Sequence, residues 1–579
     1  MSARRRIFII ASLLILAAFF LVFLLYPVLY VVKGAVAWEG KWTSAFFTAS
    51  LGDPIQRESI VNSLLLGVAV TVVTTVVSLP LALVTIRREF PLKRWLAGLV
   101  MVPMVLPPFV GAIGMKQMFA RMGTVNLLLE KLFYGLTFLL SRVGLMGRPW
   151  NMPPVDWLGQ AGFWGVVALE ALHLYPIMYL NVVASLASVD RSCEEAAYNL
   201  GASRWNVFRR ITFPLMLPGY FAGASIVFIW AFTDLGTPLI LRFRRVVPVQ
   251  IFEMVKDINA NPKGYALVLI VLLVTVVVFV GARWVVRGRL HTLATKGTSS
   301  AAVRRATPLG SFLILLFISA LTFVAVIPHL AVLLSSFSTP GGWQGTVLPT
   351  ELTWENYANL VTHPVALRGL VNSLVYSTLA TLGALVLGVL IAYLLTRERF
   401  TGKVLLDTTV MAPLALPGIV LAFGYLACFS DSFLNPMQKN PVPLLIISYI
   451  VRRLPYMVRS AVAGFQHVSQ SLEEASTSLG ARPLATLRRI TIPLVLASLT
   501  AGAILTFVFS MFEVSQSLVL AQEPAFYPVS RVLYTLFGRL KDGPYLASAM
   551  GVIGMIVLSA GLLGAGRFLG RRLGEIFRT

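Results

Sequence analysis

Two carboxylates stand at matched positions inside apolar stretches of this sequence, where an ionised group is costly unless it has a partner or a function. They are Asp234 and Glu513, and they lie 279 positions apart. Such a matched pair favours a shared wall of a path through which a charged solute passes. The alternative is that both carboxylates lie at a membrane interface or are paired within the protein.

Two arginines, Arg452 and Arg453, also interrupt an apolar stretch. The positions 279 residues earlier are His173 and Leu174. The arginines therefore break the symmetry between the two regions. Guanidinium groups here would attract an anionic substrate or a chelate, or they would neutralise Glu513.

Residues that perform covalent or metal chemistry form no recognisable pattern. The two cysteines, Cys193 and Cys428, match no metal-ligand spacing, and the five histidines form no H-x-x-x-H pair. The sequence also has no G-x-x-x-x-G-K-[S/T] phosphate loop. We therefore expect no enzyme activity, metal site or cofactor in this chain, and any ATP with its Mg²⁺ must be bound by other subunits.

A polar segment occurs twice, and its second copy follows the first by 279 positions. A polar feature that recurs at one offset among apolar runs indicates two similar halves, each of which docks a partner. The first copy contains Glu194, Glu195, Ala196 and Gly201, and the second contains Glu473, Glu474, Ala475 and Gly480.

Each copy is predicted to form two short helices that meet at the glycine. The acidic pair suits the positive end of the first helix dipole, and Gly201 or Gly480 permits a turn that other residues resist. An Arg-Arg pair closes the second helix, and Pro214 or Pro493 opens the next apolar run.

The spacing Glu-Ala-Ala, three residues, Gly, nine residues, Ile, one residue, an apolar residue and Pro resembles the coupling-helix motif of permease subunits of ATP-binding-cassette importers. The departures are small, with Ser476 in place of the second Ala, and Phe213 and Ile492 where Leu is usual.

This resemblance implies that each segment sits in a cleft of one ATPase subunit, so the expected partners include two copies of a cytoplasmic ATPase. It also implies that Glu195 and Glu474 occupy the family's acidic position, and that Gly201 and Gly480 form its turn. A periplasmic substrate-binding protein is the other partner that the family requires.

Composition agrees with a membrane protein, because 57% of the 579 residues are hydrophobic and only 12% are charged. We predict an all-α integral membrane protein with about twelve transmembrane helices, arranged as two parallel six-helix repeats of the type I importer permease fold. The predicted spans lie near residues 7–32, 60–86, 95–119, 162–188, 214–237, 265–287, 311–336, 370–396, 403–429, 443–466, 492–522 and 545–569.

The predicted halves are residues 1–290, with a coupling segment at 190–213, and residues 309–579, with a coupling segment at 469–492. A Ser/Thr/Arg-rich cytoplasmic linker at 291–308 joins them. Proline landmarks repeat at an offset of 310 before the coupling segments, so the first half has about 31 extra residues. We place these at about 120–160, in a loop rich in Gly, Pro and Trp.

Basic residues favour cytoplasmic N- and C-termini, since about 27 of the 48 Lys and Arg residues then lie inside and about 18 outside. The formal charge of +24 is explained by anionic membrane lipid, and no nucleic-acid module is present. The expected location is the bacterial inner membrane. An outer cluster of Arg242, Arg244 and Arg245 suits an acidic lobe of a binding protein or forms a solvated loop.

The fused two-half layout and the run from Asp234 to Leu239 look like the ferric-iron branch of these importers. The thiamine and 2-aminoethylphosphonate branches share the layout, so these or another small organic ion are the alternative cargoes. A different class, a secondary transporter driven by protons or sodium, would use Asp234 and Glu513 as coupling sites. The duplicated coupling segment argues against that class, because an ion-driven carrier has no use for it.

Overall fold

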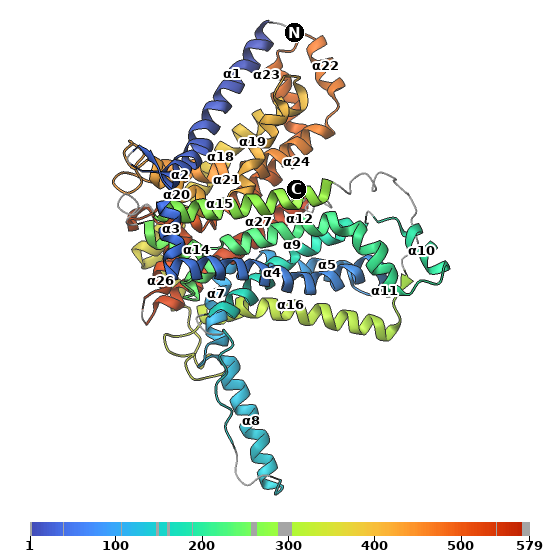
Figure 1. Cartoon of the computed structure of the whole chain (residues 1–579), viewed down its shortest axis with the longest axis vertical. Coiled ribbons are helices and arrows are strands. Elements are labelled where there is room, and N and C mark those ends of the chain that lie inside the picture. The colour runs from blue at the N-terminus through green and yellow to red at the C-terminus, as the bar shows by residue number, and fades with distance from the viewer. Residues whose placement is uncertain are drawn as a thin grey trace.

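The computed structural model describes residues 3–38, 40–105, 107–145, 150–158, 162–187, 189–255, 263–287, 304–539 and 541–569. The chain folds almost entirely into helices, and its short strands form two small pairs (Figure 1). Strands β1 (Ala37–Trp38) and β2 (Lys41–Trp42) are antiparallel, whereas β3 (Arg88–Glu89) and β4 (Arg304–Arg305) are parallel. Most of the predicted linker lies outside the described residues.

Long helices with short connections build the first half of the chain. They are α1 (Ala3–Phe20), the π-helical turn η1 (Leu21–Leu25), α2 (Tyr26–Val36), α3 (Ala45–Gly52), α4 (Pro54–Arg87), α5 (Lys93–Val100), α6 (Val102–Val105), α7 (Pro108–Phe119), α8 (Thr124–Arg142), α9 (Phe163–Ala187), α10 (Arg191–Asn199), α11 (Arg204–Val207), the π-helical turn η3 (Phe208–Thr212), α12 (Phe213–Thr233), α13 (Gly236–Ile240), α14 (Val247–Met254) and α15 (Lys263–Arg287).

The second half repeats this order, and its described residues include no counterpart of α8. Its elements are α16 (Pro308–Ser336), α17 (Glu355–Thr362), α18 (Pro364–Arg397), α19 (Lys403–Ala415), α20 (Gly418–Cys428), α21 (Val442–His467), α22 (Gln470–Ser478), α23 (Pro483–Thr486), the π-helical turn η6 (Leu487–Thr491), α24 (Ile492–Met511), α25 (Ser515–Leu520), the 3₁₀ turn η7 (Pro524–Phe526), α26 (Val529–Phe537) and α27 (Gly543–Leu569).

Among the described residues, ten helices and one bent helix pair are long and apolar enough to cross a membrane. The all-helical membrane fold is therefore confirmed. The bent pair is α19 and α20, which meet at 101° just before Pro417. Helix α21 lies where a further span is predicted, and its buried residues pack against α18 and α24.

Other predicted spans are interrupted as well, two of them near the middle of the molecule. The stretch 95–119 is divided into α5, α6 and α7, because Pro103 and Pro107 interrupt it. The stretch 492–522 ends as a helix at Met511 and resumes in the short α25. Both breaks bring irregular backbone into the middle of the molecule, which is tolerated at membrane depth only where protein or a cavity surrounds it.

The first helix of each half packs on the opposite half. Helices α1 and α2 lie along the second half, where the Tyr425 hydroxyl donates a hydrogen bond to the Phe23 carbonyl oxygen at 2.5 Å. Helix α16 packs on α5, α6 and α7 of the first half and on α27. A Cβ atom at Gly114 would lie 1.7 Å from the Pro328 carbonyl oxygen, so only glycine permits the approach of α7 to α16.

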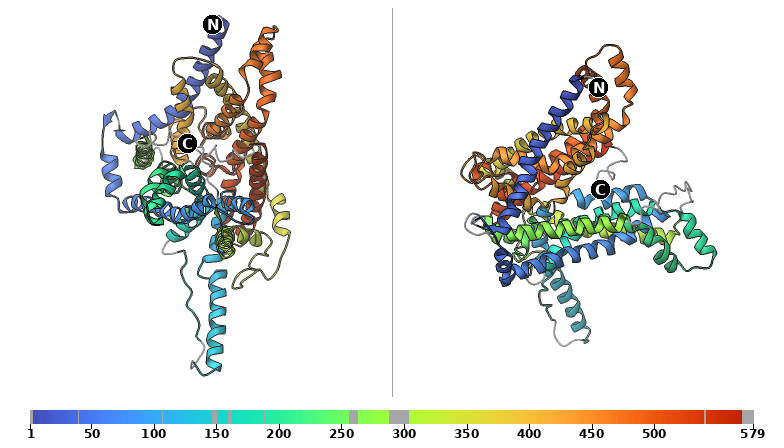
Figure 2. Two further views of the ribbon diagram at one scale, coloured as in Figure 1. Left: turned by 90° about the vertical axis from the view of Figure 1, so that its right-hand side faces the viewer. Right: turned by 45° about the horizontal axis from the view of Figure 1, so that its top comes forward.

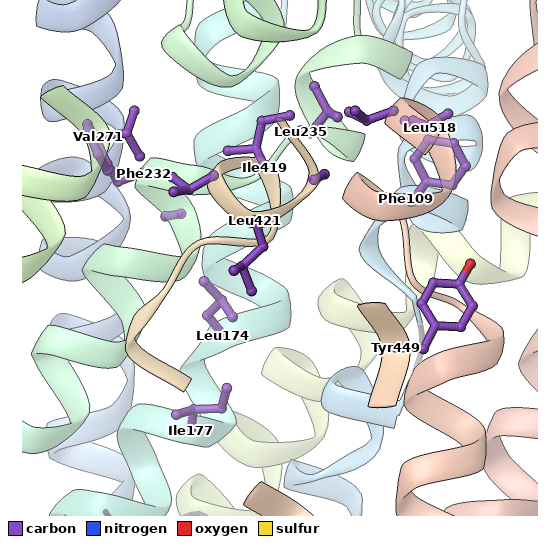
Figure 3. Close-up of a cluster of buried hydrophobic side chains, with 14 of the residues drawn as sticks. Phe109, Leu174, Ile177, Phe232, Leu235, Val271, Ile419, Leu421, Tyr449 and Leu518 are labelled. Carbon is purple, nitrogen blue, oxygen red and sulfur yellow. The ribbon is translucent and has the colours of Figure 1, made fainter. Parts of the chain in front are cut away.

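Helices α10 and α22 lie at the same end of the molecule, which we call the coupling end (Figures 1 and 2). There the two halves diverge, whereas toward the opposite end they pack together. Figure 3 shows part of this packing, where Phe109 and Leu235 of the first half lie near Ile419 and Leu518 of the second. Apart from the exchanged helices α1 and α16 and the β3–β4 pair, the two halves are thus joined away from the coupling end.

Candidate coupling segments and charged cavity

The two coupling segments have the same helical start. In α10 the Asp190 side chain accepts a hydrogen bond from the Ser192 backbone N–H at 2.9 Å, and in α22 the Ser469 hydroxyl accepts one from the Ser471 N–H at 3.3 Å. Asp and Ser are favoured caps because their side chains satisfy amides that have no partner in the first turn. Each helix then begins with acidic residues near its positive end.

Both helices also end in the same way. Gly201 has φ of +82° and Gly480 has φ of +83°, a left-handed conformation that favours glycine. The Gly201 and Ala202 amides donate to the carbonyl oxygens of Tyr198 and Ala197, a hydrogen-bond pattern known as the Schellman motif. No atom would lie within 4 Å of a Cβ at either glycine, so backbone conformation alone selects glycine there.

The first glutamate of each acidic pair is buried or half-buried and tied to the membrane helices. Glu194 forms an ion pair with Arg87 at the end of α4, with 2.5 Å between Oε1 and Nη2. The Thr212 hydroxyl, at the end of η3, also donates to Glu194. This cluster connects α10 with the end of the long helix α4 and with the start of the following span α12.

The second copy repeats the same three-residue cluster. Arg397, at the end of α18, donates from Nε to both oxygens of Glu473 at 3.2 and 3.0 Å, and from Nη2 to Oε1 at 3.1 Å. The Thr491 hydroxyl, at the end of η6, donates to Glu473 at 3.0 Å. The two clusters therefore match in residue types, positions and partners.

The second glutamate of each pair, Glu195 or Glu474, is exposed to solvent. Ala196 and Ala475 beside them are also exposed. The leucine that ends each coupling helix is exposed as well, at 89% for Leu200 and 90% for Leu479. Each segment therefore exposes both a large apolar side chain and a carboxylate.

A second candidate site is a cavity of about 220 Å³ between the two halves. Asp234, Glu170 and His173 line it from the first half, and Arg452 and Arg453 line it from the second. Aromatic and apolar residues complete the wall, among them Trp230, Tyr456, Phe509 and Phe512.

The second half has one buried carboxylate held by two arginines. Glu513 is 4% exposed, and its Oε2 atom forms ion pairs with Arg453 and, at 3.3 Å, with Arg452. Arg452 and Arg453 also donate to the backbone oxygens of Leu416 and Phe509. Glu513 is not among the residues that line the cavity, so only the arginines present charge to it from this side.

The first half has two carboxyl groups there instead. Asp234 accepts hydrogen bonds from the Gly236 and Thr237 amides at 3.3 and 2.8 Å, which begins α13. Glu170, which is 2% exposed, accepts from the Thr237 hydroxyl at 2.7 Å. Asp234 and Glu513 thus occupy matched positions in the sequence but have different partners, one backbone amides and the other arginines.

The outer arginine cluster has partners within the chain. Arg245 forms an ion pair with Glu58 at 2.7 Å, and Arg244 lies 3.8 Å from Glu253. All three arginines of the cluster are exposed.

Sequence reasoning missed several residues that the structure brings into these sites. Thr212 and Thr491 repeat at the 279 offset, and Arg87 and Arg397 at the 310 offset, so a search for repeated polar residues would have found both clusters. Glu170 has no such signal, because Tyr449 occupies its matched position.

Residues 74–291 and 384–575 both match the family model described as binding-protein-dependent transport system inner membrane component. The chain belongs to this family. It is accordingly a multi-pass inner-membrane transport component rather than an enzyme, as the sequence predicts, and this permease carries the family's domain twice in one chain.

The permease is similar to three curated relatives. It is 28% identical over 571 residues to the ferric transport system permease protein FbpB of Actinobacillus pleuropneumoniae, covering 96% of this chain and 77% of that protein. It is 28% identical over 555 residues to the putative ferric transport system permease protein FbpB 1 of Haemophilus influenzae, with 92% and 80% covered. It is 30% identical over 203 residues to the molybdate/tungstate transport system permease protein WtpB of Pyrococcus abyssi, with 35% and 80% covered.

Proposed function

We propose that this permease is the membrane subunit of an ATP-driven importer that passes ferric iron from a periplasmic binding protein to the cytoplasm. The assignment of ferric iron as the solute rests on the similarity to two ferric transport permeases over 96% and 92% of the chain. Both halves are included in these matches, so the fused layout is shared as well. The half-length relative named for molybdate and tungstate matches only 35% of the chain and supports the transport class alone.

The coupling segments are proposed to bind two ATPase subunits, one each. Exposed Glu195 and Leu200, with Glu474 and Leu479 in the second copy, provide the docking contacts. The buried glutamates have another role. Glu194 and Glu473 fasten the docked helices to the spans that must move, so that a displacement of the ATPase is transmitted to the membrane helices.

The cavity between the halves is proposed to be part of the solute path. Carboxylates from one half and arginines from the other face the same space, so a movement of the halves changes the charge that a solute meets. Carboxylate oxygens favour a metal cation, while arginines favour the anions that accompany it. Asp234, Glu170, Arg452 and Arg453 are therefore the proposed path residues, and Glu513 holds the arginines in place.

The division into halves at 1–290 and 309–579, joined by a linker at 291–308, is retained as part of the proposal. The coupling end is assigned to the cytoplasm, because the ATPases are there, and the basic residues support cytoplasmic termini. The outer arginines near Arg245 are the proposed contact for the binding protein.

Stimulation of ATP hydrolysis by loaded binding proteins tests the cargo. The permease is reconstituted in lipid nanodiscs with the ATPase and with the binding protein that its organism encodes beside it. We expect the ferric form of the binding protein to stimulate hydrolysis over its ligand-free form. If the thiamine-loaded or 2-aminoethylphosphonate-loaded binding protein stimulates hydrolysis and the ferric form does not, the proposed solute is wrong but the transport class is retained.

A further inference from the structure

Helix α8 and the segment that follows it form an arm that projects away from the rest of the molecule (Figures 1 and 2). We call α8, residues 143–145 and residues 150–158 the outer arm. It connects the end of α7 to the start of α9, and α9 then runs to the coupling segment at its other end. The outer arm therefore emerges from the end opposite the coupling segments.

Side-chain hydrogen bonds hold the two parts of the outer arm, α8 and residues 150–158, together. Asn126 is buried, accepts hydrogen bonds from the Val155 amide and the Trp157 indole, and donates to the Val155 carbonyl oxygen. Farther along α8, the buried Thr137 hydroxyl exchanges hydrogen bonds with the backbone of Trp150. Because residue 155 meets the start of α8 and residue 150 its later part, residues 150–158 run back alongside the helix.

One face of α8 is an exposed stripe of large apolar side chains. They recur at steps of three or four residues, which places them on the same side of a helix. The exposed fractions are 43% for Leu128, 62% for Leu132, 55% for Leu136, 61% for Leu139 and 74% for Val143. Glu130 lies on the opposite side of the helix and is also exposed.

Length and composition alone would allow α7 and α8 to count as a membrane span. The returning segment argues against that placement, because residues 150–155 have neither helical nor strand structure and include exposed Asn151. If α8 crossed the bilayer, this backbone would also cross it, with polar groups that hydrocarbon cannot satisfy.

The direction of α8 agrees with a position along the membrane surface. Figures 1 and 2 show α8 crosswise to the long helices α15 and α16, which are long and apolar enough to span the bilayer. A helix that runs across such spans lies closer to the plane of the membrane than to its normal. The stripe on α8 is apolar and exposed, as are residues of the spans such as Val68 and Val72 on α4.

We propose that the outer arm lies in the headgroup region of the leaflet opposite the coupling segments, with its leucine stripe among the acyl chains. Exposed Tyr134, Trp150 and Trp157 suit this depth, since aromatic residues with a polar atom favour the interface. The bilayer is thus the partner of the stripe. Residues 304–539 and 541–569 of the second half form no such arm, so the interfacial contact is asymmetric.

Spin labels along the stripe test this placement in the full complex in nanodiscs of phosphatidylethanolamine and phosphatidylglycerol. In a Cys193→Ser, Cys428→Ala background, single variants Leu128→Cys, Leu136→Cys and Leu139→Cys carry a nitroxide, and Glu130→Cys is the matched control. At the three stripe positions we expect the nitroxide to collide more often with oxygen, which is enriched among acyl chains, than with a water-soluble nickel chelate. At position 130 we expect collisions with the nickel chelate to be more frequent. The depths at Leu128 and Leu139 should agree within experimental error.

Two results would overturn the proposal. A depth that changes steadily from Leu128 through Leu136 to Leu139 would mean that α8 crosses the bilayer. Stripe labels that are shielded from both oxygen and the nickel chelate would mean that a protein, either the binding protein or a second copy of the chain, covers the stripe. Three separate positions keep the test informative if one variant is poorly produced.

Discussion

Replacing Glu473 by Gln should loosen the second coupling segment while leaving its docking surface intact. The substitution removes the charge that Arg397 and Thr491 contact but preserves side-chain size. The Arg397 side chain is only 8% exposed, so water cannot readily replace the lost partner.

The structure sets the size of the effect. Removing one partner of a buried ion pair costs about 3 kcal/mol or more, and a charged hydrogen bond about 1.5–3 kcal/mol. Because Gln still accepts one hydrogen bond, we expect the opening of α22 to become easier by about 2 kcal/mol, which is ~30-fold in its equilibrium. In the first copy Arg87 is 32% exposed, so Glu194→Gln should cost less, about 1 kcal/mol.

Hydrogen exchange of the purified permease measures this opening directly. Amides of α22 should exchange ~30-fold faster in Glu473→Gln than in the unmodified chain. The matched control is Glu474→Gln, one residue along and exposed, which should leave exchange unchanged but weaken the binding of the ATPase. Fully assembled Glu473→Gln should retain the ATPase and hydrolyse ATP with less transport per ATP.

The reasoning fails if Glu473→Gln leaves the exchange of α22 unchanged, since the cluster would then not hold the helix. It also fails if both substitutions have the same effect, because the proposed division between an anchoring and a docking glutamate would be wrong.

Three further outcomes follow from the two sites. The double variant Gly201→Val, Gly480→Val should lose co-purifying ATPase, because the left-handed conformation costs a residue with a Cβ about 1–2 kcal/mol, and a β-branched residue more. Asparagine tolerates this conformation, so Gly→Asn at both sites should retain the ATPase. An unchanged ATPase yield with valine would contradict the predicted turn. Arg453→Ala should lower the melting temperature, because buried Glu513 loses one of its ion-pair partners at a cost of about 3 kcal/mol. Adding Glu513→Gln should recover part of the lost stability. A double variant with no recovery would argue against the pairing. Asp234→Asn should reduce transport several-fold while ATPase binding stays normal, since its contacts are distant from the coupling end; unchanged uptake would make this carboxylate structural.

The membrane class, the repeat and the coupling segments could be predicted because each leaves a local pattern. Apolar runs of about 20 residues identify spans wherever they occur. The glycine turns follow from the residues around Gly201 and Gly480 alone, and the structure has both in the left-handed conformation.

Contacts between distant helices leave no such pattern. The placement of α1 on the second half and of α16 on the first depends on side-chain fit over the whole molecule, as at Gly114 and Pro328. The same is true of Glu170, which joins the cavity because α13 brings Thr237 to it. The different partners of Asp234 and Glu513 also depend on neighbours that differ between the halves.

The extra segment at 120–160 could be located but not described from sequence. The sequence predicts a loop there, and this is wrong for residues 124–142, which form the 19-residue helix α8. Hydrogen bonds from Asn126 and Thr137 to a returning segment hold this helix, and such medium-range contacts cannot be read from hydropathy.

Uptake of radioactive ferric iron into proteoliposomes tests the central claim most directly. The sequence has no phosphate loop, so the permease alone should neither bind nor hydrolyse ATP. With the ATPase and the loaded binding protein present, we predict uptake that requires ATP and persists when ionophores collapse the proton and sodium gradients. Uptake by the permease alone, driven by either gradient and unaffected by ATP, would contradict the account and identify an ion-driven carrier.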